Sequence, residues 1–428
     1  MKKTFVLLFS LSLLGVYAQE NIEYQKPPKE ILELVDVERA PSVRMDDQQE
    51  FMVLLYRDAY KTIEELSQEE MRLAGLRINP KTNIGSRTNY YNNIKIRNIR
   101  NNEKDARQVA GLPDNPLLTN FSWSPDQKRM AFTHTVSDGV ELWVLDLENA
   151  SVRKLTEATV NANMGDEINW FENSRAMLVK MLPADRETLI DKDEAVPTGP
   201  TVSVNEGKKA QNRTYQDLLS DKIDEHNFEQ LAHSEIYKVY ISGQKEKWLG
   251  SAMYRGISFS PDGEYVMVSK IHRPFSYLVP YYRFPYITSI YTKNAKKVET
   301  VLDVPLIEDL PQGFMAVRTG RRNLVWRDDK PSTLVYTEAL DGGDPDSSIA
   351  YRDEVFLLEA PFQGEGEPLL KTQNRYSGIQ WGNDHLAIAY DYWWNTRNTK
   401  TYVFDPAKPK KEPVVFFYCN YQDRYSDS

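Results

Sequence analysis

A hairpin that recurs five times is the clearest pattern of apolar and polar positions in this chain. Each copy begins with an apolar residue, a variable residue and an aromatic residue, then passes through a polar turn into a strand with alternating apolar positions. Alternation with a period of two predicts β-strands that bury one face. The five copies are FSWSPDQKRMAF (121–132), INWFENSRAMLV (168–179), ISFSPDGEYVMV (257–268), LVWRDDKPSTLVY (324–336) and IQWGNDHLAIAY (379–390).

Two of the turns carry residues that favour a tight reversal. Proline presets φ in both, and Asp126 and Asp262 follow the prolines, where an aspartate accepts hydrogen bonds from its own backbone. Gly263 adds a residue that tolerates positive φ. A second strand pair follows each hairpin, so one unit contains four strands. These second pairs begin near residues 140, 234, 289, 353 and 399.

Repeated four-stranded units are typical of a β-propeller, because a blade buries its faces only when a neighbour stacks on it. The hairpins start at 121, 168, 257, 324 and 379, so insertions must account for the uneven spacing. A sandwich of unrelated hairpins is the alternative. The segment 89–111 has a less regular form of the same pattern. We therefore predict an all-β propeller of about six to seven four-stranded blades, with an incomplete last blade.

Two segments break the blade pattern. Residues 19–80 are predicted to form a partly helical lead-in, with a capping box from Thr62 to Glu65 at the start of an amphipathic stretch that includes Met71 and Leu73. A helical insertion is predicted at about 195–232, with a polar helix at 214–231. The propeller is expected to occupy residues 81–428.

The first 18 residues have the form of a secretory signal peptide. Lys2 and Lys3 precede an apolar run too short to span a bilayer, and cleavage is expected after Ala18. We therefore expect a soluble protein exported to the periplasm or the exterior. Cys419 is the only cysteine, so no internal disulfide forms. The net charge of −9, with both signs interspersed, disfavours nucleic acid or an anionic membrane as a partner.

Several segments resemble the glutamyl endopeptidase branch of the prolyl oligopeptidase superfamily of serine peptidases, family S9. The resemblance covers the chain from about Leu76 to its end. It implies an enzyme with an N-terminal propeller and a C-terminal α/β-hydrolase domain that bears a Ser-Asp-His triad. The segments that carry it are RTYQDLLSDKIDE (213–225), IHRPFSYLVPYYRFP (271–285), LIEDLPQGF (306–314), VRTGRRNLVWRDDKPSTLVYTEALDGGDP (317–345), RDEVF (352–356) and NYQDRYSDS (420–428).

Catalytic residues are not identified in this chain. A hydrolase nucleophile sits in a G-x-S-x-G turn, and the nearest approach, around Ser258, lacks the second glycine and falls in a predicted strand. We therefore expect the hydrolase domain to be absent. The five histidines do not have the spacing of a zinc site. A loop with Asp341, Asp344 and Asp346 lacks the pattern of an EF-hand and is predicted to be a solvated turn. No metal or cofactor is predicted.

The resemblance implies a propeller that controls access of peptides to a hydrolase domain supplied elsewhere. Cleavage after glutamate would require a cationic site, because a guanidinium can donate two parallel hydrogen bonds to the two carboxylate oxygens. The candidate substrate-binding residues are Arg273, Arg283, Arg318, Arg321 and Arg322. The alternative function is a stand-alone exported propeller that binds a protein or a glycan. The sequence leaves the peptide specificity and the oligomeric state open.

Overall fold

Antiparallel four-stranded sheets account for most of the computed structural model, which describes residues 27–195, 214–423 and 425. The predicted signal peptide lies outside these residues, as does the part of the predicted insertion at 196–213. The all-β prediction and the propeller class are confirmed. Within the described ranges, no helix is long and apolar enough to cross a membrane.

The strands follow one another in chain order within each blade, from the innermost to the outermost. The first blade contains β1 (Ser42–Met45), β2 (Phe51–Tyr56), β6 (Asn93–Asn98) and β7 (Arg107–Gln108). The second contains β8 (Leu118–Trp123), β9 (Arg129–Val136), β10 (Gly139–Asp146) and β11 (Ser151–Lys154). The fifth contains β19 (Arg322–Trp326), β20 (Thr333–Ala339), β21 (Asp353–Glu359) and β22 (Glu367–Thr372). The sixth contains β23 (Arg375–Asn383), β24 (Leu386–Trp393), β25 (Asn398–Phe404) and β26 (Val414–Asn420).

The third and fourth blades share one strand. β15 (Lys245–Phe259) pairs with β14 on one side and β16 on the other, which joins the two blades into a seven-stranded sheet. Met253 marks the point where the strand passes from one blade to the next, because it pairs with both His233 and Ile271. The other strands of this sheet are β12 (Ile168–Trp170), β13 (Ala176–Met181), β14 (His233–Tyr240), β16 (Tyr265–Ile271), β17 (Tyr286–Thr292) and β18 (Lys297–Val304).

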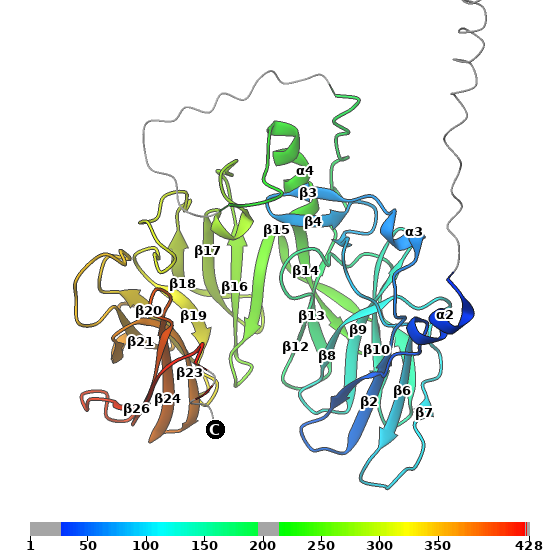
Figure 1. Ribbon diagram of the computed structural model, residues 1–428. Helices are drawn as coiled ribbons and strands as arrows, with labels where there is room; N and C mark the ends of the chain where they lie inside the picture. The colour runs from blue at the N-terminus through cyan, green and yellow to red at the C-terminus, as the bar shows by residue number, and fades with distance from the viewer. Residues whose placement is uncertain (1–26, 196–213, 424, 426–428) are drawn as a thin grey trace, which may run out of the picture.

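The six blades follow one another along an arc, with β2 and β24 at its opposite ends (Figure 1). The sixth blade, expected to be incomplete, contains four paired strands. Its outermost strand, β26, forms the edge of the sheet and exposes an apolar row. The exposed side chains in this row are Val414, Val415, Phe416, Phe417 and Tyr418.

The aromatic residue of the repeated hairpin connects neighbouring blades. The indole N–H of Trp170 donates to the carbonyl of Ser122 in the preceding blade at 3.2 Å, and Trp326 donates to Ser258 at 3.3 Å. In both pairs the acceptor is the residue just before the aromatic position of the preceding repeat. The repeated aromatic therefore packs each sheet on its neighbour and also satisfies its own polar group.

The predicted turn chemistry is confirmed, and the turns also join blades. The Asp126 carboxylate accepts from the backbone N–H of Lys128 at 3.1 Å, and Asp262 accepts from Glu264 at 3.1 Å. The backbone N–H of Asp126 also donates to the Ser174 hydroxyl in the next blade at 2.9 Å. These aspartates thus stabilise both their own reversal and the contact between sheets.

The lead-in differs from the prediction, because β1 and β2 already belong to the first blade. Helix α2 (Lys29–Val35) precedes them. Helix α3 (Ile63–Leu66) has the predicted capping box, since Thr62 and Glu65 exchange hydrogen bonds. The amphipathic helix does not continue beyond it. Residues 71–85 instead form a three-stranded sheet of β3 (Met71–Leu73), β4 (Leu76–Asn79) and β5 (Ile84–Gly85). The turn at Ala74 and Gly75, both with positive φ, reverses the chain there.

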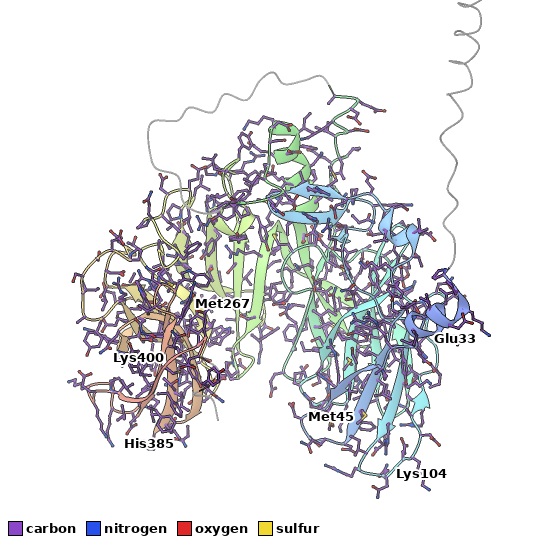
Figure 2. The ribbon with its side chains drawn as sticks, viewed as in Figure 1. Glu33, Met45, Lys104, Met267, His385 and Lys400 are labelled. Atoms are coloured by element: carbon purple, nitrogen blue, oxygen red, sulfur yellow. The ribbon has the colours of Figure 1, made fainter. Side chains whose placement is uncertain are left out.

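The predicted insertion contains α4 (Lys222–Ala232), which begins eight residues later than predicted and has Asp221 as its N-cap residue. The register places one row of residues at the end of the third and fourth blades nearest α4: His233, Met253, Ile271, Tyr286 and Val304. The loops 272–285 and 305–321 therefore lie at the same end as α4. Turns that carry Lys104 and His385 lie at the opposite end (Figure 2).

The indole bond between blades predicts a measurable stability difference. Replacing Trp326 by Phe keeps an aromatic ring but leaves the Ser258 carbonyl without its donor, so it is expected to cost about 1 kcal/mol more than the matched change Trp123→Phe. Trp123 is also half-buried, and its indole N–H has no hydrogen bond to any described residue. Urea unfolding of both variants tests this, and equal losses would contradict a role for the hydrogen bond.

Candidate functional site

A cap formed by three segments covers one end of the third and fourth blades. We define it as the small sheet at 71–85, helix α4 and the loop 272–285, which lie together above β14 and β15 (Figure 1). Backbone hydrogen bonds join the segments: Tyr281 of the loop donates to the carbonyl of Ala74 at 2.8 Å, and Gly75 donates to the carbonyl of Asp217, shortly before α4, at 2.7 Å. Segments separated by some two hundred residues thus form one unit.

The cap has its own apolar core, which continues into the blades. Phe228 of α4 packs edge-on against Phe275 and Phe284 of the loop, with ring centroids 5.2 and 5.6 Å away. The same cluster contains Ile78 of the small sheet and Met253 of β15. Because this core is shared, the cap has a fixed position on the end of the blades. Several of these side chains come from the segments that carry the family resemblance.

Arg273, the first predicted substrate-binding residue, fastens the loop to α4. Its guanidinium binds Glu225 at 2.6 Å and Glu229 at 2.7 Å, and it stacks on the ring of Phe275. The Glu229 hydrogen bond, opposed by burial and helped by Glu225, raises the pKa of Arg273. Glu225 also accepts from the Tyr277 hydroxyl at 2.6 Å. The charge of Arg273 is therefore neutralised inside the cap.

The next three predicted arginines lie in the two loops at this end and do not converge. Arg283 is buried and lies over the ring of Tyr215, 5.3 Å from its centroid. Arg318 donates to the carbonyls of Thr319 and Arg321. Arg321 donates to the carbonyls of Val301 and Gly364 and lies over Tyr336. Each has a structural contact within the protein.

Arg322, the fifth candidate, belongs to a buried charge network that the sequence did not reveal. Its guanidinium binds Asp353 at 2.6 Å. Arg375 binds the same carboxylate at 3.0 Å. It also donates two hydrogen bonds to the Asp341 carboxylate, at 2.8 and 2.7 Å. Arg352 binds Asp341 as well, at 2.8 Å. The network connects the inner strands of the fifth and sixth blades.

The prediction of a solvated turn at 341–346 is wrong for Asp341. Its side chain is fully buried. Burial opposes ionisation, but the hydrogen bonds from Arg375 and Arg352 hold the pKa of Asp341 below its usual value. The aspartate spacing could not reveal this, because its partners lie in strands that only the fold brings near. Within the described ranges no group of side chains is arranged to hold a metal ion.

Two curated proteins match this chain along most of its length. It is 34% identical over 418 residues to a probable chloroplastic glutamyl endopeptidase of Oryza sativa subsp. japonica, covering 94% of this chain and 44% of that protein. It is 34% identical over 417 residues to the Arabidopsis thaliana protein of the same name, covering 94% of this chain and 43% of that protein. The chain is a homologue of these glutamyl endopeptidases.

The chain spans less than half the length of the curated relatives. No protein-family model matches it. Among solved structures, an acylaminoacyl peptidase of Pyrococcus horikoshii aligns with a TM-score of 0.42 and 14% identity, covering 90% of this chain and 46% of that one.

Ser258 of this chain, the residue that comes nearest to a nucleophile motif, lies within a blade. It belongs to β15 and pairs with Met267 of β16, while its carbonyl accepts the indole N–H of Trp326. A serine in the middle of a paired strand does not have the exposed strand-to-helix turn that a hydrolase nucleophile requires. The structure thus agrees with the prediction that Ser258 is an ordinary strand residue.

The buried charge network around Asp341 and Asp353 predicts that Arg375→Met strongly lowers the stability of the fold. This change leaves the Asp341 and Asp353 carboxylates buried with one arginine each, so it is expected to destabilise the fold by about 3–5 kcal/mol. Adding Asp341→Asn removes the charge of one of the two buried carboxylates that lose the hydrogen bonds from Arg375, and is expected to restore part of the loss. Urea unfolding tests both variants, and a double variant no more stable than Arg375→Met would contradict the electrostatic explanation.

A second prediction concerns the pH dependence of Glu70, which lies next to the small sheet of the cap. The hydrogen bond from Ser86, with smaller contributions from Arg72 and Arg87, lowers the pKa of Glu70 from 4.5 to about 2. Because the folded pKa lies below the unfolded one, the stability that Glu70 contributes is complete above pH 4.5 and is lost as the pH falls toward 2.

The stability advantage of the wild type over Glu70→Gln should therefore shrink across this interval. Unfolding by urea at a series of pH values measures it. Glu69→Gln is the control, since Glu69 is exposed and has no hydrogen-bond partner among the described residues. An advantage that stays constant between pH 5 and pH 2 would be at odds with the ionised Glu70 pairing.

Proposed function

We propose that this chain is the propeller part of a serine peptidase of family S9 that cleaves peptides after glutamate, and that it controls the access of peptides to a hydrolase domain supplied elsewhere. Taken alone, the chain is inactive. The observation that carries this proposal is the 34% identity to probable glutamyl endopeptidases across 94% of the chain.

The cap supports a role in peptide binding. It projects from one end of the third and fourth blades and is built from segments with the family resemblance. Of the predicted arginines, Arg318 and Arg321 bind carbonyl oxygens in place of carboxylates, so their positive charges are not neutralised by those contacts. These two are accordingly the stronger candidates among the five for attracting an acidic peptide.

Export is part of the proposal. The signal-like segment at 1–18 supports transport to the periplasm or the exterior, where the chain would meet peptide substrates. The single cysteine is compatible with such a compartment because no disulfide is required for this fold. No nucleic acid or membrane partner is proposed. The alternative, a stand-alone propeller that binds a protein or a glycan, is not favoured by the comparisons.

The proposal predicts binding without cleavage. A fluorescein-labelled peptide that contains glutamate should raise its anisotropy on addition of the purified chain, while mass spectrometry finds the peptide intact after prolonged incubation. A serine-reactive fluorophosphonate should leave the chain unlabelled. Cleavage of the peptide by the purified chain would contradict its inactivity, and unchanged anisotropy would contradict the proposed contact with peptides.

A further inference from the structure

Among the described residues Arg186, like Arg318 and Arg321, has no carboxylate partner, whereas several other arginines form ion pairs. Arg77 binds Asp217 at 2.6 Å, Arg273 binds two glutamates, and Arg322 binds Asp353. Arg186 makes one hydrogen bond to a described residue, from a terminal nitrogen to the amide oxygen of Asn83 at 3.0 Å. In the part of the chain that the structure describes, no carboxylate lies within ion-pair distance of it.

A rigid set of amides holds the partner of Arg186. Asn83 is buried in the small sheet of the cap, and its side-chain nitrogen donates to Asn161 at 2.7 Å. Asn161 in turn donates to the carbonyls of Leu231 and His233, where α4 meets β14. Contacts with the small sheet, α4 and the third blade thus hold the amide oxygen of Asn83 in position next to Arg186.

The guanidinium of Arg186 is half-buried, and burial lowers its pKa. A guanidinium has five N–H donors, and an amide oxygen compensates its charge less than a carboxylate does. A desolvated cation without a counter-charge gains more from an incoming anion than a cation that already has an ion pair. The structure therefore has a cationic group at the cap with donors left for a ligand.

We propose that Arg186 binds the carboxylate of an acidic side chain in a bound peptide and thereby contributes to selectivity for glutamate. This inference rests on the proposed function, because it assumes that peptides reach the cap end of the blades. Asn83 acts as the positioning residue, since it fixes one edge of the guanidinium and leaves the other edge for the ligand. The two carboxylate oxygens match that edge in a bidentate geometry.

The test compares two peptides on the whole chain. Fluorescein-labelled alanine-rich pentapeptides carry either glutamate or glutamine at the centre, and anisotropy titration gives a Kd for each. The wild type should bind the glutamate peptide with a Kd about tenfold lower than that of the glutamine peptide, which is the difference expected from one hydrogen bond to a charged group. Arg186→Gln should remove this preference, and Arg186→Lys should keep part of it because the positive charge remains.

Arg153→Gln is the matched control, since Arg153 is an exposed arginine on the outermost strand of the second blade. It should retain the full preference. A glutamate preference that persists in Arg186→Gln, or that is absent in the wild type, would overturn the inference. In either case, measurable binding of the peptides would still support the proposed function. If the wild type bound neither peptide, the proposed function would fail together with the inference.

Discussion

Face-to-face packing of neighbouring sheets is the constraint on which this structure depends. No blade has a core of its own on both faces, so each buries its apolar residues only against the next. The largest apolar clusters accordingly combine residues of adjacent blades, such as Val140 and Val179. The repeated aromatic residue stabilises this contact in two ways: its ring buries apolar area, and in Trp170 and Trp326 the indole N–H donates a hydrogen bond to the preceding repeat.

The cap uses a different source of stability. Three segments distant in sequence meet on the ends of two blades, and most of their charges are paired there. Lys192 binds Asp221 and Asp224 at 3.0 and 2.6 Å, close to the Arg273 pairs described above. Such a surface combines an apolar interior with compensated charges. Arg186 is an exception in this setting, because among the described residues its guanidinium is bound by an amide oxygen and not by a carboxylate.

Local patterns predicted the features that depend on neighbours in sequence. The alternation of the five hairpins, the aspartate turns and the capping box at Thr62 are confirmed, because each is determined by residues within a few positions. Long-range contacts were beyond such patterns. The stretch at 71–79 became a hairpin in place of a helix because it packs on α4, and Asp341 is buried because Arg375 arrives from the next blade. The importance of Arg186 depends likewise on the folded position of Asn83.

The shared strand β15 has a consequence for how the molecule opens. Because one continuous strand supplies the outer edge of the third blade and the inner edge of the fourth, neither blade can detach without disturbing the other. These two blades should behave as a single cooperative unit in native-state hydrogen exchange, with the cap protected alongside them. The first and sixth blades share no strand with a neighbour and can fluctuate more independently.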